Sequence, residues 1–226
     1  MTAMAGVRAC VFDAYGTLFD FGSAVAQCAE VPDEKRPALT AIWRDKQIQY
    51  TLLRSMQRRY ADFETVTAEA LDYALDSTRL ASGLRPRLLE LYRTVSAYPE
   101  VSDTLRALRQ RGLRTAILSN GTPGMLAAAT AHAGISDRLD HVLSADTVGI
   151  YKPAAHVYQL AVDALAVPAD SICFISSNGW DAHGAAVFGF RVVWCNRSGH
   201  PAERLPGTPR AVIADLAELP DLLDRV

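Results

Sequence analysis

Short apolar runs alternate with helical patterns along most of this chain, and this order limits the fold more than any other feature. Beginning at Pro99, helical periodicity and apolar runs typical of strands follow one another toward the C-terminus. The runs occupy residues 113–118, 141–143, 171–175 and 191–195, with a shorter one near residue 212. Repeated β–α units of this kind predict an α/β fold, in which a parallel sheet is covered by helices on both faces.

A further strand-like run opens the chain at residues 7–12, and a long helical stretch separates it from the others. Helical patterns cover residues 39–60, about 62–76 and about 84–96. The side chains expected on one helical face are Leu39, Ile42, Trp43, Leu53, Met56 and Tyr60. We therefore predict a core domain formed by residues 1–20 and 98–226, with residues 21–97 inserted after the first strand as an all-helical unit.

Polar residues stand where several of the predicted strands end. Asp13 directly follows the first apolar run, Ser119 and Asn120 follow the second, Lys152 lies in a later connection, and residues 176–181 follow another run. Each of these alone is compatible with an ordinary turn or helix cap. Because the carboxyl ends of parallel strands meet at one edge, where α/β proteins bind ligands, we expect one shared pocket. It would hold a carboxylate nucleophile, hydroxyl and amide donors, an ammonium and a second carboxylate.

The composition narrows the class of protein. The chain has 226 residues, half of them hydrophobic, and its 23 Lys and Arg against 25 Asp and Glu are mixed without a block of like charge. Nucleic acid is therefore not an expected partner. No basic leader followed by an apolar stretch and no run of about 18 apolar residues is found, so we expect a cytoplasmic protein and no membrane partner. The four cysteines lack C-x-x-C spacing and are interpreted as reduced packing residues.

The motifs at the strand ends resemble those of one enzyme superfamily. They read DAYGTLFD at 13–20, LSNG at 118–121, YKP at 151–153 and SSNGWD at 176–181. Together they are similar to the haloacid dehalogenase superfamily and, within it, to the L-2-haloacid dehalogenases. The similarity spans nearly the whole chain and includes IWRDKQ at 42–47, which resembles that family's helical cap segment with its active-site arginine. The resemblance implies a Rossmann-like core and a cap that closes over the pocket.

Two departures separate the chain from the magnesium-dependent phosphatases of the same superfamily. Those enzymes usually carry a second aspartate two residues after the nucleophile, where this chain has Tyr15. They also commonly bring two acidic residues to the last motif, where this chain has only Asp181. Asp13 and Asp181 alone would give magnesium few carboxylate ligands, whereas Lys152 would favour the ionised form of Asp13. We therefore predict a reaction that needs neither a metal nor another cofactor.

The resemblance assigns a two-step hydrolysis of short L-2-haloacids, such as chloroacetate and L-2-chloropropionate. Asp13 would displace the halide and form an ester, and water would then release the 2-hydroxy acid with inverted configuration. By similarity, Ser119 and Lys152 would hold the substrate carboxylate, and Arg44 and Asn120 would stabilise the departing halide. The residues that would orient the reacting carboxylates and the ammonium are Thr17, Ser176 and Asn178. Those that would line the alkyl pocket are Tyr15, Ile48, Phe63 and Trp180.

Some assignments stay open at the sequence level. The base for ester hydrolysis is Asp181 by resemblance, but His183 lies two residues further on, and an imidazole is a side chain well matched to proton transfer at neutral pH. His183 would therefore suit that role as well. Asp45 stands where the family usually has glutamine, so it either points away or changes the pocket. A phosphatase and a non-catalytic protein that binds a small acid are the rival interpretations. The sequence is also compatible with a homodimer, which is common among similar proteins.

Overall fold

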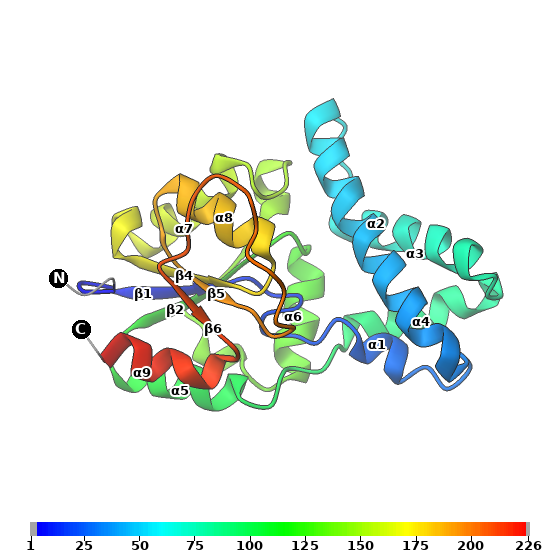
Figure 1. The fold of residues 1–226 in the computed structure, drawn as a ribbon, viewed down its shortest axis with the longest axis horizontal. Coiled ribbons are helices and arrows are strands. Elements are labelled where there is room, and N and C mark those ends of the chain that lie inside the picture. The colour runs from blue at the N-terminus through cyan, green and yellow to red at the C-terminus, as the bar shows by residue number, and fades with distance from the viewer. Residues whose placement is uncertain (1–3, 225–226) are drawn as a thin grey trace.

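The computed structural model describes residues 4–224 and contains a six-stranded sheet beside a group of helices (Figure 1). The strands are β1 (Ala9–Phe12), β2 (Arg114–Ser119), β3 (His141–Ser144), β4 (Ile172–Ser176), β5 (Arg191–Cys195) and β6 (Ala211–Ile213). Their order in the sheet is β3-β2-β1-β4-β5-β6, and each neighbouring pair is parallel. The predicted α/β fold with a parallel sheet is confirmed.

Helices cover both faces of this sheet. They are α5 (Val101–Gln110), α6 (Pro123–His132), α7 (Ala155–Leu165), α8 (Gly179–Phe188) and α9 (Leu219–Asp224). In Figure 1, α7 and α8 lie above the sheet, and α5 and α9 lie below it. The chain runs outward from β1 to β2 and β3, and then crosses to β4 on the other side of β1. This reversal places a topological switch point between β1 and β4, where open α/β sheets bind ligands.

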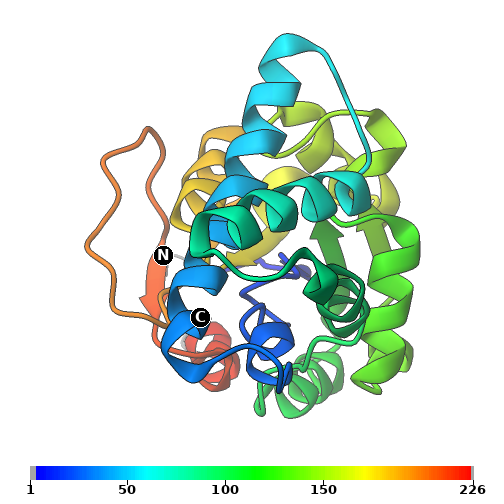
Figure 2. The ribbon, with the colours of Figure 1, turned by 90° about the vertical axis from the view of Figure 1, so that its right-hand side faces the viewer.

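Four helices lie between β1 and α5 along the chain and form what we call the helical insert. They are α1 (Ser23–Ala26), α2 (Arg36–Gln57), α3 (Phe63–Thr78) and α4 (Arg85–Arg93). Short 3-10 helices occupy Asp33–Lys35, Ser82–Leu84, Ser136–Arg138, Ala145–Val148, Ala169–Ser171 and Leu216–Glu218. Figures 1 and 2 show the insert beside the edge of the sheet at which the strands end. The two segments that join the insert to the sheet pair with each other, since the Tyr98 N–H donates to the Leu18 carbonyl at 3.0 Å.

The long helix α2 buries a stripe that differs from the predicted one. Its buried side chains are Leu39, Trp43, Gln47 and Thr51. They are spaced by four residues and therefore lie on one side of the helix. The predicted face is correct for Leu39 and Trp43 but wrong for Leu53 and Met56, which are 43 % and 82 % exposed. The stripe turns polar toward the end of α2, which an apolar periodicity cannot detect.

Two further features concern the environment of the chain. Among residues 4–224, no helix combines the length and the apolar character needed to cross a bilayer. All four cysteines are buried with free thiols, and Cys10 and Cys173 lie opposite each other in the β1–β4 pair. Their burial supports the packing role expected from the sequence.

Candidate active site

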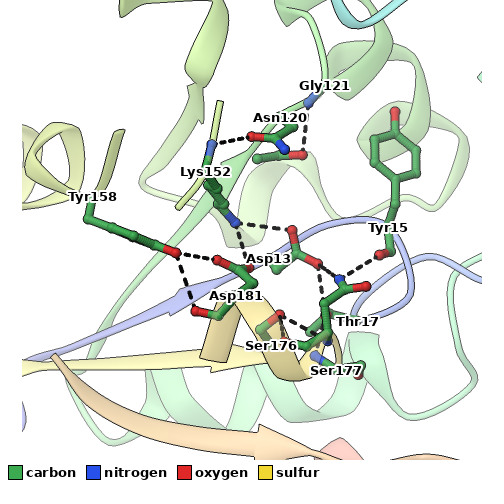
Figure 3. Close-up of polar contacts among 12 residues, drawn as sticks. Asp13, Tyr15, Thr17, Asn120, Gly121, Lys152, Tyr158, Ser176, Ser177 and Asp181 are labelled. Atoms are coloured by element: carbon green, nitrogen blue, oxygen red, sulfur yellow. Dashed lines mark hydrogen bonds and ion pairs between the residues drawn. The ribbon is translucent and has the colours of Figure 1, made fainter. Parts of the chain in front are cut away.

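Polar residues from several elements meet at the carboxyl edge of the sheet (Figure 3). Asp13 follows β1, Ser119 ends β2 and Ser176 ends β4, while Asp181 lies in the first turn of α8. Lys152 comes from the connection between β3 and α7. The parallel sheet therefore gathers residues that are up to 168 positions apart, between Asp13 and Asp181, at its switch point.

The ammonium group of Lys152 lies between two carboxylates. Its Nζ is 3.1 Å from Asp13 Oδ1 and 2.9 Å from Asp181 Oδ2, and the side chain is only 1 % exposed. Burial alone would lower the pKa of Lys152, but the charges of Asp13 and Asp181 outweigh burial and raise this pKa above its usual value. Lys152 is therefore positively charged at neutral pH and neutralises part of the charge of both aspartates.

Asp181 is fully buried and is held from a second side by Tyr158. The Tyr158 hydroxyl donates to Asp181 Oδ1 at 2.8 Å, while Lys152 holds Oδ2. Burial raises the pKa of Asp181; the Lys152 charge opposes this rise, the Asp13 charge adds to it, and the resulting pKa is above the usual value. Burial also raises the pKa of Tyr158, so its hydroxyl keeps its proton. Asp181 is thus a stronger base than an ordinary carboxylate.

The second oxygen of Asp13 is held by two donors. Asp13 Oδ2 accepts from the Thr17 hydroxyl at 3.1 Å and from Asn178 Nδ2 at 2.8 Å. The Thr17 hydroxyl in turn accepts from the Ser177 backbone N–H at 2.8 Å, which fixes the direction of its own proton. With Lys152 on Oδ1, both carboxylate oxygens have partners, so the carboxylate is fixed in one orientation.

Three predicted site residues shape the surrounding turns. The Ser176 hydroxyl accepts from the Asn178 N–H at 3.1 Å, so it forms the turn after β4 rather than contacting a charged group. The Ser119 hydroxyl accepts from the Gly121 N–H at 3.1 Å. The Asn120 side-chain oxygen accepts from the Lys152 N–H at 3.0 Å, which leaves its amide NH₂ as the part that can donate to a bound anion.

Arg44 reaches this edge from α2 in the helical insert. Its Nη2 donates to the Tyr15 carbonyl at 3.1 Å and to Asn178 Oδ1 at 3.0 Å. The same Asn178 side chain donates to Asp13, so only one amide separates the guanidinium from the Asp13 carboxylate. Arg44 is thus a cation from the insert placed beside residues of the sheet edge.

A narrow cavity lies between these residues. Its lining is formed by Asp13, Tyr15, Arg44, Ile48, Thr51, Phe63, Ser119, Asn120, Asn178 and Trp180. The predicted wall residues Tyr15, Ile48, Phe63 and Trp180 are therefore all present. The Tyr15 hydroxyl and the Trp180 indole N–H are buried without a hydrogen-bond partner among the described residues. The free volume is about 20 Å³, little more than a water molecule needs, so the walls must separate to admit a larger ligand.

Two residues left open by the sequence lie away from this cavity. His183 is 7 % exposed, and its Nδ1 lies 3.2 Å from the carbonyl of Leu205, a residue of the loop between β5 and β6. It follows Asp181 by two positions on α8, and residues at that spacing do not share a helix face. Asp45 is exposed on α2 and is not among the residues that line the cavity, so its carboxylate points away from Asp13.

The structure adds residues that the sequence interpretation did not select. Thr51 lines the cavity, and Gln47 accepts a hydrogen bond from Arg44 Nη1 at 2.8 Å. The sequence could have indicated both residues by their positions on α2. Gln47 lies three residues after Arg44 and Thr51 three residues after Ile48, and residues at this spacing are neighbours on a helix.

The donor set does not fit the magnesium ion used by many proteins of this fold. Magnesium prefers an octahedral set of oxygen ligands with carboxylates among them. Here the two carboxylates of the site, Asp13 and Asp181, share the Lys152 ammonium instead. Within residues 4–224, no group of three or more His, Cys, Asp or Glu side chains is arranged to hold a metal ion.

Known proteins share both the sequence and the fold. A family model of haloacid dehalogenase-like hydrolases matches residues 7–189. The (S)-2-haloacid dehalogenase 1 of Pseudomonas sp. (strain CBS-3) is 45% identical over 97% of this chain and 98% of its own. The crystal structure of a dehalogenase matches with a TM-score of 0.94 at 43% identity, covering 97% of this chain and 98% of that one.

A further solved structure is that of L-2-haloacid dehalogenase from Xanthobacter autotrophicus with chloropropionic acid covalently bound. It matches with a TM-score of 0.87 at 35% identity, covering 96% of this chain and 98% of that one. Sequence identity at this level over almost the full length of both chains shows that these proteins are homologous. The protein is a hydrolase that belongs to the haloacid dehalogenase-like family and, within it, to the L-2-haloacid dehalogenases.

Proposed function

We propose that the protein hydrolyses short L-2-haloacids to D-2-hydroxyacids and halide through an ester on Asp13. The observation that carries this proposal is the buried Asp13 carboxylate, which has a partner on each oxygen and lines a cavity together with apolar side chains and anion-binding groups. A carboxylate in this setting is a nucleophile of fixed orientation. The relative with covalently bound chloropropionic acid supports an ester as the intermediate.

In the first step, an Asp13 oxygen attacks the α-carbon of the haloacid on the side opposite the halogen. A carbon–oxygen bond forms as the carbon–halogen bond breaks, and the halide leaves with the bonding electron pair. The configuration at the α-carbon is therefore inverted. Because a halide needs no proton to leave, the absence of an aspartate at position 15 is compatible with this chemistry.

Two groups of donors would hold the two charges of the substrate. Ser119, the backbone amides after Asp13 and the Lys152 ammonium are assigned to the substrate carboxylate. Arg44 and the free NH₂ group of Asn120 are assigned to the departing halide, with the Phe63 ring against it. A cation and an amide donor placed where negative charge develops stabilise the transition state more than the ground state.

In the second step, water attacks the carboxyl carbon of the Asp13 ester. The bond between this carbon and the alkoxide oxygen breaks, so the product leaves with an oxygen that belonged to Asp13. We assign the base to Asp181, because its raised pKa strengthens it as a proton acceptor and Tyr158 and Lys152 hold it in place. The Nδ1 atom of His183 lies against the Leu205 carbonyl. The alternative, in which His183 is the base, stays a prediction.

Residues 21–97 would act as a cap over the site. Arg44, Ile48 and Phe63 reach the cavity from this segment, while Asp13 and Ser119 reach it from the sheet edge. The free volume of about 20 Å³ is too small for a haloacid, so substrate entry requires the two sets of residues to move apart.

Chloride release from L-2-chloropropionate tests the proposal, with the D-enantiomer and an aryl phosphate as alternative substrates. We expect chloride from the L-enantiomer alone, at a rate that a chelator does not change, and none with freshly purified Asp13→Asn, because an amide is a poor nucleophile. Magnesium-dependent release of phosphate would establish the phosphatase interpretation. Binding of the haloacid without chloride release would identify a non-catalytic protein.

A further inference from the structure

A buried glutamine inside the helical insert connects to the active site. Gln47 lies on α2, three residues after Arg44, and its side chain is completely buried. A buried amide must satisfy its donors and its acceptor within the protein, because water cannot reach them. Gln47 does so through Arg44, Thr67 and Tyr92, at 2.8, 2.7 and 3.2 Å respectively.

These partners leave only one orientation for the Gln47 amide. The Thr67 hydroxyl donates its single proton to the Phe63 carbonyl at 2.6 Å, one turn earlier in α3. Toward Gln47 it can therefore only accept, which requires the Gln47 NH₂ group on that side. The amide oxygen then faces Arg44 Nη1 and accepts from it. The hydrogen-bonding pattern of α3 thus determines which end of the Gln47 amide Arg44 meets.

The same interaction extends through Arg44 to the nucleophile. Arg44 Nη2 donates to Asn178 Oδ1 at 3.0 Å, and Asn178 Nδ2 donates to Asp13 Oδ2 at 2.8 Å. A guanidinium is planar and rigid, so holding Nη1 at Gln47 determines the direction in which Nη2 points. A continuous series of hydrogen bonds therefore runs from Thr67 in the insert to the carboxylate of Asp13.

We propose that Gln47 is a positioning residue, which holds the Arg44 guanidinium against Asn178 and in line with the leaving halide. Gln47 does not line the cavity, so its effect on the halide would pass through Arg44, whose guanidinium it holds. The proposal rests on the proposed function in one respect, namely that Arg44 stabilises the halide. Because Gln47 donates to Thr67 of α3 and to Tyr92 of α4, a correct Arg44 orientation also depends on the packing of α2 against these two helices.

The test compares Gln47→Leu with Gln49→Leu. The control residue Gln49 lies on the exposed side of the same helix, where it pairs with Lys46. We expect Gln47→Leu to lower kcat by about 10- to 100-fold, the range for loss of a hydrogen bond to a charged group, with a smaller change in KM. The loss should be larger for 2-chloropropionate than for 2-bromopropionate, because chloride is the poorer leaving group and needs Arg44 more. Gln49→Leu should match the wild type.

A second variant separates positioning from packing and keeps the test valid if Gln47→Leu does not fold. In Gln47→Glu, a carboxylate would form an ion pair with Arg44 and draw the guanidinium away from Asn178, and it could not donate to Thr67. Once protonated, the acid offers an acceptor to Arg44 and a donor to Thr67, as the amide does. The activity of Gln47→Glu relative to wild type should therefore rise as the pH falls.

The outcomes distinguish the positioning role of Gln47 from the halide role of Arg44. Wild-type kcat and an unchanged chloride-to-bromide ratio in Gln47→Leu would overturn the positioning role. So would a deficit in Gln47→Glu that is the same at each pH, because it would mean lost packing alone. If Arg44→Ala leaves the halide ratio unchanged while Gln47→Leu is impaired, the halide role of Arg44 fails instead. Absence of chloride release by the wild type would refute the proposed function itself.

Discussion

Replacement of Lys152 by methionine should expose how much the fold depends on the charge balance of the active site. The methionine side chain is of similar length and apolar, so the change removes the cation with little change in shape. In the wild type, this cation is 3.1 Å from Asp13 Oδ1 and 2.9 Å from Asp181 Oδ2, and it is almost inaccessible to solvent. The variant would bury two carboxylates beside each other with no positive charge between them.

The magnitude follows from these distances. At an effective dielectric constant of about 20, each contact of roughly 3 Å is worth about 5 to 6 kcal/mol of Coulomb energy. Much of this gross energy offsets the cost of removing the charges from water, and the measured loss on removing one partner of a buried ion pair is about 3–5 kcal/mol. We therefore expect Lys152→Met to lower the free energy of unfolding by about 3–5 kcal/mol at neutral pH.

The loss should depend on pH with a definite sign. In the wild type, the pKa of Lys152 is raised, so its stabilising contribution is present at neutral pH and is lost only as the pH rises through that raised value. In the variant, the pKa of Asp181 should rise further, because the opposing charge of Lys152 is gone. A carboxyl whose pKa is higher in the folded than in the unfolded protein makes the fold less stable as the pH rises. The deficit of the variant should thus be smaller at pH 5 than at pH 8.

Urea unfolding at the two pH values measures these differences, with Lys46→Met as a control. Lys46 lies on α2 and pairs with the exposed Gln49, so its replacement should change stability by less than about 1 kcal/mol. Adding Asp181→Asn to Lys152→Met should recover part of the loss, because one of the two unpaired charges is removed. A loss below about 1 kcal/mol in Lys152→Met, or strictly additive costs in the double variant, would refute the reasoning.

Three further predictions concern the reaction. In a single turnover with enzyme in excess in heavy-oxygen water, the new hydroxyl of the hydroxy acid should carry light oxygen from Asp13. Heavy oxygen found there by mass spectrometry would mean that water attacks the substrate carbon directly. Arg44→Ala should slow chloride release by on the order of 3 kcal/mol in activation free energy. Arg44→Lys should restore little of the lost rate, because an ammonium lacks the planar fork of a guanidinium. Near-normal rates in Arg44→Ala would show that Arg44 does not stabilise the halide. Asp181→Asn should release one equivalent of halide and then retain the ester, which is detected as added mass on the intact protein. His183→Ala should turn over repeatedly. An adduct found only in His183→Ala would mean that His183, and not Asp181, is the base.

The convergence of Asp13, Ser119 and Ser176 could be predicted because it follows from a general rule. Each residue directly follows or ends an apolar strand, and a parallel sheet brings all such ends to one edge. Only the parallel arrangement of the strands was needed, and the alternation of β and α patterns along the chain predicted it. The contact between Arg44 and Asn178 is different, because it joins the insert to the sheet across 134 positions. Only the resemblance to a known family indicated Arg44.

The environment of Arg44 could not be predicted for a physical reason. The buried stripe of α2 contains Gln47 and Thr51. The Gln47 amide is satisfied by partners in α3 and α4, and the Thr51 hydroxyl donates to the Ile48 carbonyl of α2 itself. A hydrophobic pattern selects apolar residues, so it favoured Leu53 and Met56, which are exposed. The polar members of a buried surface become visible only when the hydrogen-bonding groups of the facing helices are known.

The choice between Asp181 and His183 shows the same limit at the level of a single helix. Sequence alone placed both residues near the start of α8, and an imidazole is the better base when no surroundings are known. The helix separates them, because a spacing of two residues turns Asp181 toward Lys152 and Tyr158 and His183 toward the Leu205 carbonyl. Burial then raises the pKa of Asp181, while Lys152 and Tyr158 keep the carboxyl oriented. A carboxylate whose basicity is raised by burial is therefore compatible with the role of base that the resemblance gives to Asp181, and the alternative role of His183 stays a prediction.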